Sequence, residues 1–130
     1  MRFIKGYWKS FIVCIFISYT CLMPSTGIDV YTFVGIDKIA HLLMYSLLGS
    51  VMCWESLVLG LRGWRLYIIN IALPLLGGGM IELIQERWFY PRTGELGDWL
   101  ADCIGVLIGF CLVMCIRYFY TKKRAKRMAK

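Results

Sequence analysis

The sequence contains little charge and a single histidine. Only 18% of its 130 residues are Asp, Glu, Lys or Arg, whereas 59% are hydrophobic, and the mean hydropathy is +0.64. A soluble domain of this length could not bury so much apolar surface in its own core. The composition therefore predicts a chain that lies mainly within a lipid bilayer.

Paired metal-binding and catalytic motifs are also lacking. The six cysteines show no C-x-x-C spacing and lie within or beside apolar stretches, where we expect them to pack as small apolar residues. With one histidine and no well-placed thiolate, a zinc site is a poor fit, and we predict no metal and no cofactor. No Ser-His or Cys-His arrangement indicates a covalent nucleophile, so the sequence favours binding over catalysis.

What the sequence does contain is apolar stretches close to the ~20 residues that a helix needs to cross ~30 Å of hydrocarbon. We predict an all-α bundle of four transmembrane helices in one domain, residues 1–130. The predicted spans are about 7–23, 38–59, 66–88 and 98–120, followed by a basic tail at 121–130. Pro74 and the run from Gly77 to Gly79 predict a kink or a close helix contact in the third span. Lys5 and Lys9 also fit a signal peptide, but no small-x-small cleavage site follows, so we expect a retained helix.

Lysine and arginine are distributed unevenly. Twelve of the fifteen lie at the amino terminus up to Lys9, between the second and third spans, or in and after the end of the fourth. Only Lys38, Arg87 and Arg92 lie on the other side. The positive-inside rule then places both termini in the cytoplasm. The basic tail is expected to bind anionic lipid, and no nucleic-acid partner is predicted because no base-reading module is present.

The acidic residues show the opposite distribution. Of eight, only Glu55 lies toward the cytoplasmic half of its predicted span. The other seven lie in outer loops or near the outer ends of spans: Asp29, Asp37, Glu82, Glu86, Glu95, Asp98 and Asp102. An ionisable group in hydrocarbon costs a few kcal/mol, roughly 3 on insertion scales, so those within spans are expected to face a bundle interior or a wet cavity.

At about 100° per residue, the polar residues of three spans fall on single helix faces. The second span carries Asp37, His41 and Tyr45; the third carries Gly78, Glu82 and Gln85; the fourth carries Asp98, Asp102, Gly105 and Gly109. We predict that these faces surround one outward pocket, with Glu82, Gln85, Asp102 and His41 as its floor and Asp37, Asp98 and Arg92 as its rim. The glycines would allow close helix packing. The excess of carboxyl groups favours shared protons and a cationic or hydroxyl-rich ligand, and it would also suit a hard cation.

Structural roles fit several of these residues equally well. Asp37 and Asp98 stand where helices are predicted to begin, so either is a candidate N-cap. His41 could serve only as a hydrogen-bonding link to a carboxylate, and Tyr45 could belong to the core. The aromatic residues near the outer ends are typical of an interfacial belt: Trp88, Phe89, Tyr90 and Trp99.

Four motifs occur in order along the chain. They are Asp37-Lys38-x-x-His41 with Tyr45, Glu82-x-x-Gln85, Pro91-Arg92, and Asp98-x-x-Ala101-Asp102-x-x-Gly105-x-x-x-Gly109. Over roughly residues 20–112 the chain resembles the VanZ-like family of small bacterial membrane proteins. It departs from that family at Asp102, where asparagine is usual, and at Cys103, where a small polar residue is usual. The added carboxylate favours proton sharing.

The family takes its name from a protein associated with low-level teicoplanin resistance. The resemblance therefore implies a bacterial inner-membrane protein facing the envelope, with a lipid-linked or glycopeptide ligand. We expect Glu82, His41 and Asp102 to bind it or exchange protons, Arg92 to contact an anionic part, and Asp37 to orient His41. Three alternatives stay open: a membrane-embedded hydrolase or transferase acting on a lipid, a small transporter or flippase acting as an oligomer, and a structural membrane subunit.

Overall fold

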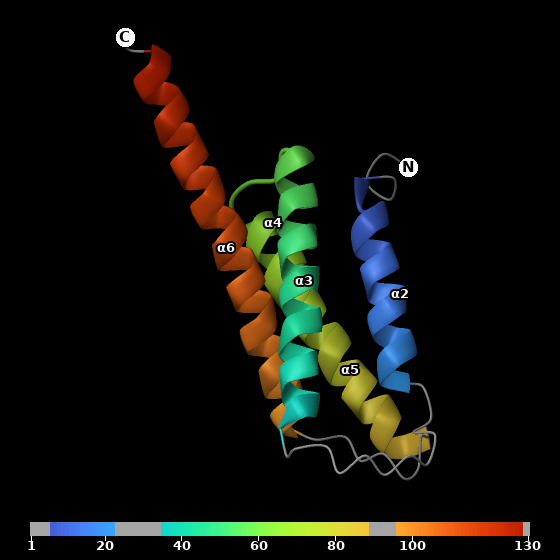
Figure 1. Ribbon diagram of the computed structural model, residues 1–130. Helices are drawn as coiled ribbons and strands as arrows, with labels where there is room; N and C mark the ends of the chain where they lie inside the picture. The colour runs from blue at the N-terminus through green and yellow to red at the C-terminus, as the bar shows by residue number, and fades with distance from the viewer. Residues whose placement is uncertain (1–5, 23–34, 89–95, 129–130) are drawn as a thin grey trace.

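The chain folds into helices that lie side by side in one bundle (Figure 1). The computed structural model describes residues 6–22, 35–88 and 96–128, and within these ranges it contains no strand. The elements are α2 (Trp8–Leu22), α3 (Ile36–Val58), α4 (Trp64–Tyr67), the π-helix η1 (Ile68–Ala72), α5 (Leu73–Trp88) and α6 (Leu96–Met128). Because α4, η1 and α5 follow without interruption, Trp64–Trp88 forms one apolar helix of 25 residues.

Three helices of the described chain are long and apolar enough to cross a membrane. They are Ile36–Val58, Trp64–Trp88 and Leu96–Met128, of 23, 25 and 33 residues. The fourth helix, α2, is also apolar, but its 15 residues fall short of the ~20 that a full span needs. Large apolar side chains such as Leu43, Leu76 and Leu83 are more than 60% exposed on the outer faces of the bundle. The predicted all-α helical membrane bundle is thus confirmed.

Helices α3 and α6 form the closest helix pair and lie side by side from their first turns (Figure 1). Three glycines stand in their contact. An ideal Cβ built on Gly105 would lie 2.5 Å from the carbonyl oxygen of Leu42, and one on Gly49 would lie 2.6 Å from that of Val106. Gly109 would bring a Cβ against the α3 backbone in the same way. Only glycine leaves room for this approach of two backbones, and Gly105 and Gly109 are the packing positions named from the sequence.

The third span departs from α-helical geometry one turn before Pro74. Proline has no N–H, so the carbonyl group of Asn70, four residues earlier, loses its α-helical donor. The chain is π-helical over Ile68–Ala72, and the N–H of Leu73 accordingly donates to the carbonyl oxygen of Ile68. The sequence predicted an irregularity at Pro74 and the glycine run. The structure has this irregularity in the turn before Pro74, because the missing N–H of proline affects the preceding turn.

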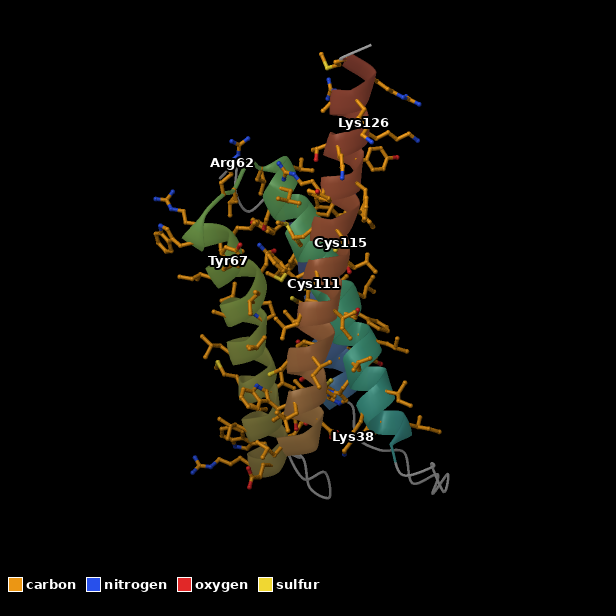
Figure 2. All side chains as sticks on the ribbon, turned by 90° about the vertical axis from the view of Figure 1, so that its left-hand side faces the viewer. Lys38, Arg62, Tyr67, Cys111, Cys115 and Lys126 are labelled. Carbon is orange, nitrogen blue, oxygen red and sulfur yellow. The ribbon has the colours of Figure 1, made fainter. Side chains whose placement is uncertain are left out.

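Helix α6 is longer than its predicted span. It continues from Leu96 to Met128, eight residues past the expected end near Tyr120. The basic tail is therefore helical over its described part, and Lys126 and Arg127 occupy the last turn, where positive charge stabilises a helix. Figure 2 shows Lys126 on the part of α6 that extends past Arg62 in the α3–α4 connection.

A buried carboxylate joins the start of α2 to α3. Glu55 is 5% exposed, and its two oxygens accept hydrogen bonds from the hydroxyl group of Ser10 (2.5 Å) and from the backbone N–H groups of Lys9 (3.1 Å) and Ser10 (3.2 Å). The first N–H groups of a helix have no partner within the helix. Glu55 therefore satisfies two of them and places negative charge at the positive end of the helix dipole.

The glycine contact gives a first testable prediction. Replacing Gly105 by Ala should lower the free energy of unfolding by about 1–3 kcal/mol, because the added methyl group overlaps the α3 backbone. Thermal unfolding in detergent micelles, followed by far-UV circular dichroism, measures the change. Gly77→Ala is the matched control: no atom lies within 4 Å of its ideal Cβ, so it should be neutral or slightly stabilising. Equal melting temperatures for the two variants would contradict the packing account.

Candidate functional site

Six ionisable side chains gather at the end of the bundle where α3 and α6 begin and α5 ends, which we call the acidic end. They are Asp37, Lys38, His41, Glu82, Asp98 and Asp102. Figure 2 shows the labelled Lys38 at this end, opposite Arg62 and Lys126. Four carboxyl groups thus stand against one lysine and one histidine. The residues come from three helices, as the helical faces in the sequence predict.

The centre of the site is a buried pair between α3 and α6. The Nδ1 atom of His41 lies 3.0 Å from Oδ1 of Asp102, and the two residues are only 5% and 1% exposed. The pair lies beside the glycine contact, since Asp102 precedes Gly105 by one turn and His41 immediately precedes Leu42. The approach of the two backbones therefore sets the distance between the imidazole and the carboxylate.

Asp37, which the sequence led us to expect as the partner that orients His41, does not take that place. It lies one turn earlier on α3 and is exposed, while the hydrogen bond of Nδ1 goes to Asp102 on α6. An oxygen of Asp37 still lies within 4.8 Å of the His41 ring nitrogen and of an Asp98 oxygen. Asp37 thus contributes negative charge at the edge of the site.

Glu82 of α5 completes the buried group. It is 8% exposed, and one ligand atom each from His41, Glu82 and Asp102 lies within 4.8 Å of the others. Two carboxyl groups at this spacing in a low-dielectric interior repel each other strongly when both are charged. The arrangement therefore favours a shared proton or a bound cation between them.

A small space borders this group at Gly78. The Oδ2 atom of Asp102 is fully buried and makes no hydrogen bond to any residue of the described ranges. An ideal Cβ on Gly78 would lie 3.0 Å from this oxygen and 3.2 Å from the hydroxyl group of Tyr45. Tyr45 is itself 2% exposed. The absent side chain of Gly78 thus leaves the carboxylate and the phenol facing the same position.

At the edge of the site, Lys38 forms an ion pair with Asp98. Its Nζ atom lies 3.2 Å from Oδ1 of Asp98, and the two side chains are 45% and 8% exposed. The structure corrects the capping role considered for the two aspartates. The N-cap of α3 is Gly35, with no side-chain hydrogen bond, and α6 begins at Leu96. Asp37 and Asp98 therefore lie in the first turns, where their charges favour the helix dipoles.

The other predicted residues have separate places. Gln85 is buried, and its Nε2 atom donates a hydrogen bond of 2.6 Å to the carbonyl oxygen of Cys21, so it joins α5 to the end of α2. The indole of Trp99 donates to the carbonyl oxygen of Leu75 (3.1 Å) and so links α6 to α5. Arg92, Phe89 and Tyr90 lie outside the described residues.

A second buried polar group, which the sequence analysis did not identify, lies at the opposite end. The hydroxyl group of Ser56 is hydrogen-bonded to the phenol of Tyr7 (2.7 Å) and to the side-chain amide of Asn70 (2.9 Å). Asn70 also donates to the carbonyl oxygen of Leu66 (2.6 Å). Together with Glu55 and Ser10, these residues join α2, α3 and the third span. Their signal in the sequence is polarity within otherwise apolar spans.

The same end carries an apolar groove between α3 and α6. Its volume is about 360 Å³, and it is lined by Trp54, Leu57, Val58, Ile116, Arg117, Tyr120 and Thr121. One positive charge therefore borders an otherwise largely apolar surface. Exposed basic residues continue along α6 beyond the groove, at Lys122, Lys123, Arg124, Lys126 and Arg127.

Comparison of the chain with protein-family models, with curated proteins and with solved structures finds no match. A buried imidazole held by a carboxylate, with a second carboxyl group beside it, can exchange protons or hold a positive group.

The His41–Asp102 pair is more deeply buried than the Lys38–Asp98 pair, so its coupling free energy should be larger. A double-mutant cycle measures this difference. We expect His41→Leu and Asp102→Leu to show a coupling free energy of about 1–3 kcal/mol, because the pair is shielded from water. Lys38→Met and Asp98→Asn should show less than about 1 kcal/mol, since nearly half of the Lys38 side chain is exposed to water. Reversible unfolding of each variant in bicelles gives both values, and a larger coupling for the Lys38 pair would contradict this account.

Proposed function

We propose that this chain is a VanZ-like protein of the bacterial cytoplasmic membrane that binds a polar envelope molecule at its acidic end. The observation that supports this most strongly is the buried group of His41, Glu82 and Asp102, contributed by three helices at one depth. Ionisable groups within a membrane are costly and mark functional sites by default. The ordered motifs that resemble the VanZ-like family add to this proposal.

The orientation follows from the charge distribution. Basic residues at the end that carries Arg62, Arg65 and the last turns of α6 favour a cytoplasmic position for that end under the positive-inside rule. Both termini are then cytoplasmic, and the acidic end faces the envelope. A lipid-linked headgroup or a glycopeptide would reach the site from that side, in keeping with a role in teicoplanin-type resistance.

The charges of the site favour a cationic or hydroxyl-rich part of such a molecule. Four carboxyl groups against one lysine and one histidine attract positive groups and accept hydrogen bonds. Asp102 offers an oxygen that makes no hydrogen bond to the described residues, in a region where such a bond is stronger than in water. Arg92 would contact an anionic part of the ligand.

A second candidate is an acid/base-assisted hydrolase or transferase that acts on a lipid. The hydrogen bond between Nδ1 of His41 and Oδ1 of Asp102 favours it, because a carboxylate that accepts from Nδ1–H orients the imidazole as a general base. Turnover of radiolabelled membrane lipids by the purified protein, lost in His41→Gln, would favour this candidate over binding alone.

The space at Gly78 provides a test that leaves every charged group in place. Gly78→Ala would put a methyl group against Asp102 Oδ2 and the Tyr45 hydroxyl, so it should weaken ligand binding at least about tenfold, or ~1.4 kcal/mol. The measurements are calorimetric titration of the protein in lipid nanodiscs with teicoplanin or a polyprenyl-linked cell-wall precursor, and teicoplanin susceptibility of a host expressing each variant.

Gly77→Ala, one residue away in open space, is the control and should bind as the native chain does. His41→Gln should lose binding together with Gly78→Ala. If both variants keep full affinity and the host phenotype while melting normally, the acidic end is not the ligand site.

We further propose that an anionic phospholipid occupies the groove between α3 and α6. Its acyl chain would pack against Trp54, Leu57 and Ile116, and its phosphate would pair with Arg117. The exposed basic residues of α6 would attract the same leaflet, by ~1 kcal/mol each. Membrane lipid is thus the partner proposed for the end that carries Arg62, Arg65 and the last turns of α6, which we call the basic end.

For this groove, Arg117→Gln should reduce the preference for phosphatidylglycerol over phosphatidylcholine by about fivefold, the equivalent of ~1 kcal/mol. Native mass spectrometry of the protein released from mixed-lipid nanodiscs measures the retained lipids. Arg87→Gln, which removes an exposed charge from the acidic end, is the matched control and should leave the preference unchanged. An equal loss in both variants would show that only net charge matters.

A further inference from the structure

We infer that His41, Glu82 and Asp102 form a binding site for a divalent transition-metal ion such as Mn²⁺ or Zn²⁺. The binding of the ion stands on the geometry of the three residues alone. Its part in holding an envelope ligand rests on the function proposed above. In the sequence, one histidine and no well-placed thiolate made zinc a poor fit, whereas the fold brings two carboxylates to the single imidazole.

The three candidate ligand atoms are spaced closely enough to bind one metal ion. Metal–nitrogen and metal–oxygen bonds of about 2.0–2.2 Å place two neighbouring ligand atoms roughly 3 Å apart. His41 Nδ1 and Asp102 Oδ1 are 3.0 Å apart, and one ligand atom each of His41, Glu82 and Asp102 lies within 4.8 Å of the other two. A small side-chain adjustment of Glu82 would bring all three onto one ion, with the imidazole proton on Nε2.

The second oxygen of Asp102 is also buried. Asp102 is 1% exposed, and its Oδ2 atom makes no hydrogen bond to any residue that the structure describes. Gly78 leaves the space beside this oxygen without a side chain. A buried carboxylate oxygen with no donor is costly, and a metal ion bound by both oxygens of Asp102 would supply the missing partner.

The net charge of the three side chains also favours a divalent ion. Two ionised carboxylates and a neutral imidazole carry two negative charges, which one divalent ion cancels within the membrane. Glu55, the buried carboxylate at the opposite end, offers a contrast, because three donors from α2 already satisfy it. Among the residues that the structure describes, only the acidic-end group combines buried carboxylates with a metal-binding nitrogen.

One nitrogen and two carboxylate oxygens suit Mn²⁺, Fe²⁺ or Zn²⁺ better than Ca²⁺ or Mg²⁺, which prefer oxygen alone. Three protein ligands would leave at least one coordination position open. A hydroxyl or phosphate oxygen of an envelope molecule could take that position. The ion would thereby allow an acidic site to accept an anionic group that its carboxylates would otherwise repel.

The test uses the full-length protein in lipid nanodiscs, stripped with a chelator and titrated with Mn²⁺ or Zn²⁺. Free Mn²⁺ is measured by electron paramagnetic resonance and bound Zn²⁺ by elemental analysis after desalting. The native chain should bind about one ion per chain. His41→Gln, Asp102→Asn and Glu82→Gln should each weaken binding at least about tenfold, as loss of a metal ligand does.

Glu86→Gln is the matched control, because it makes the same substitution on α5 at an exposed position, and it should bind as the native chain does. Circular dichroism checks that Asp102→Asn, nearly identical in shape to aspartate, retains the fold. Binding no greater than that of empty nanodiscs, or equal binding by all variants, would overturn the metal site.

The two proposals fail separately. If no metal binds but Gly78→Ala still abolishes binding of teicoplanin or the precursor, the ion is excluded and the ligand site stands. If one metal ion binds and depends on His41 and Asp102 while neither ligand binds, the metal site stands and the proposed function fails.

Discussion

The contact between the backbones of α3 and α6 is the constraint on which the rest of the structure depends. Gly49, Gly105 and Gly109 allow the two helices to approach until a single methyl group would overlap the opposite main chain. A contact this close leaves the helices little freedom to slide or rotate against each other. Side chains one turn away are then fixed as well, which is how His41 comes to face Asp102. The polar site is therefore a consequence of small residues that carry no chemistry themselves.

Within hydrocarbon, each polar group needs a partner supplied by the protein, and the two ends of this bundle meet that need differently. At the basic end, both oxygens of Glu55 accept hydrogen bonds, and Ser56, Asn70 and Tyr7 are bonded to one another. At the acidic end, His41 and Asp102 share one hydrogen bond, and the second oxygen of Asp102 makes none within the described chain. The first arrangement is complete and joins helices. In the second arrangement, one carboxylate oxygen can still accept a hydrogen bond or bind a cation. This difference distinguishes a candidate binding site from a structural link between helices.

The sequence predicted the helices and their polar faces well because both follow from short-range regularities. Hydropathy identified the apolar stretches, and the 3.6-residue period placed His41, Glu82 and Asp102 on faces that the fold brings together. The partner of His41 could not be found this way, because a periodic pattern along α3 favours Asp37 while the cross-helix distance favours Asp102.

Helix ends were also less predictable. The second, third and fourth spans begin about two residues earlier than expected, so Asp37 and Asp98 fall inside first turns, and α6 continues as a helix through charged residues that hydropathy assigns to a tail. The network around Glu55 could not be predicted from the sequence because its members are far apart in the chain: Ser10 precedes Glu55 by 45 residues. Contacts of this kind depend on tertiary packing alone.

The short helix α2 has a further consequence for how the molecule sits in lipid. Glu55 holds its first turn and Gln85 holds the carbonyl group of Cys21 in its last, so its height along the bundle is set by the protein. A free helix of 15 residues would respond to a thicker bilayer by shifting or changing its tilt. Because both described ends of α2 are bonded to neighbouring helices, α2 cannot shift along the bundle independently of α3 and α5.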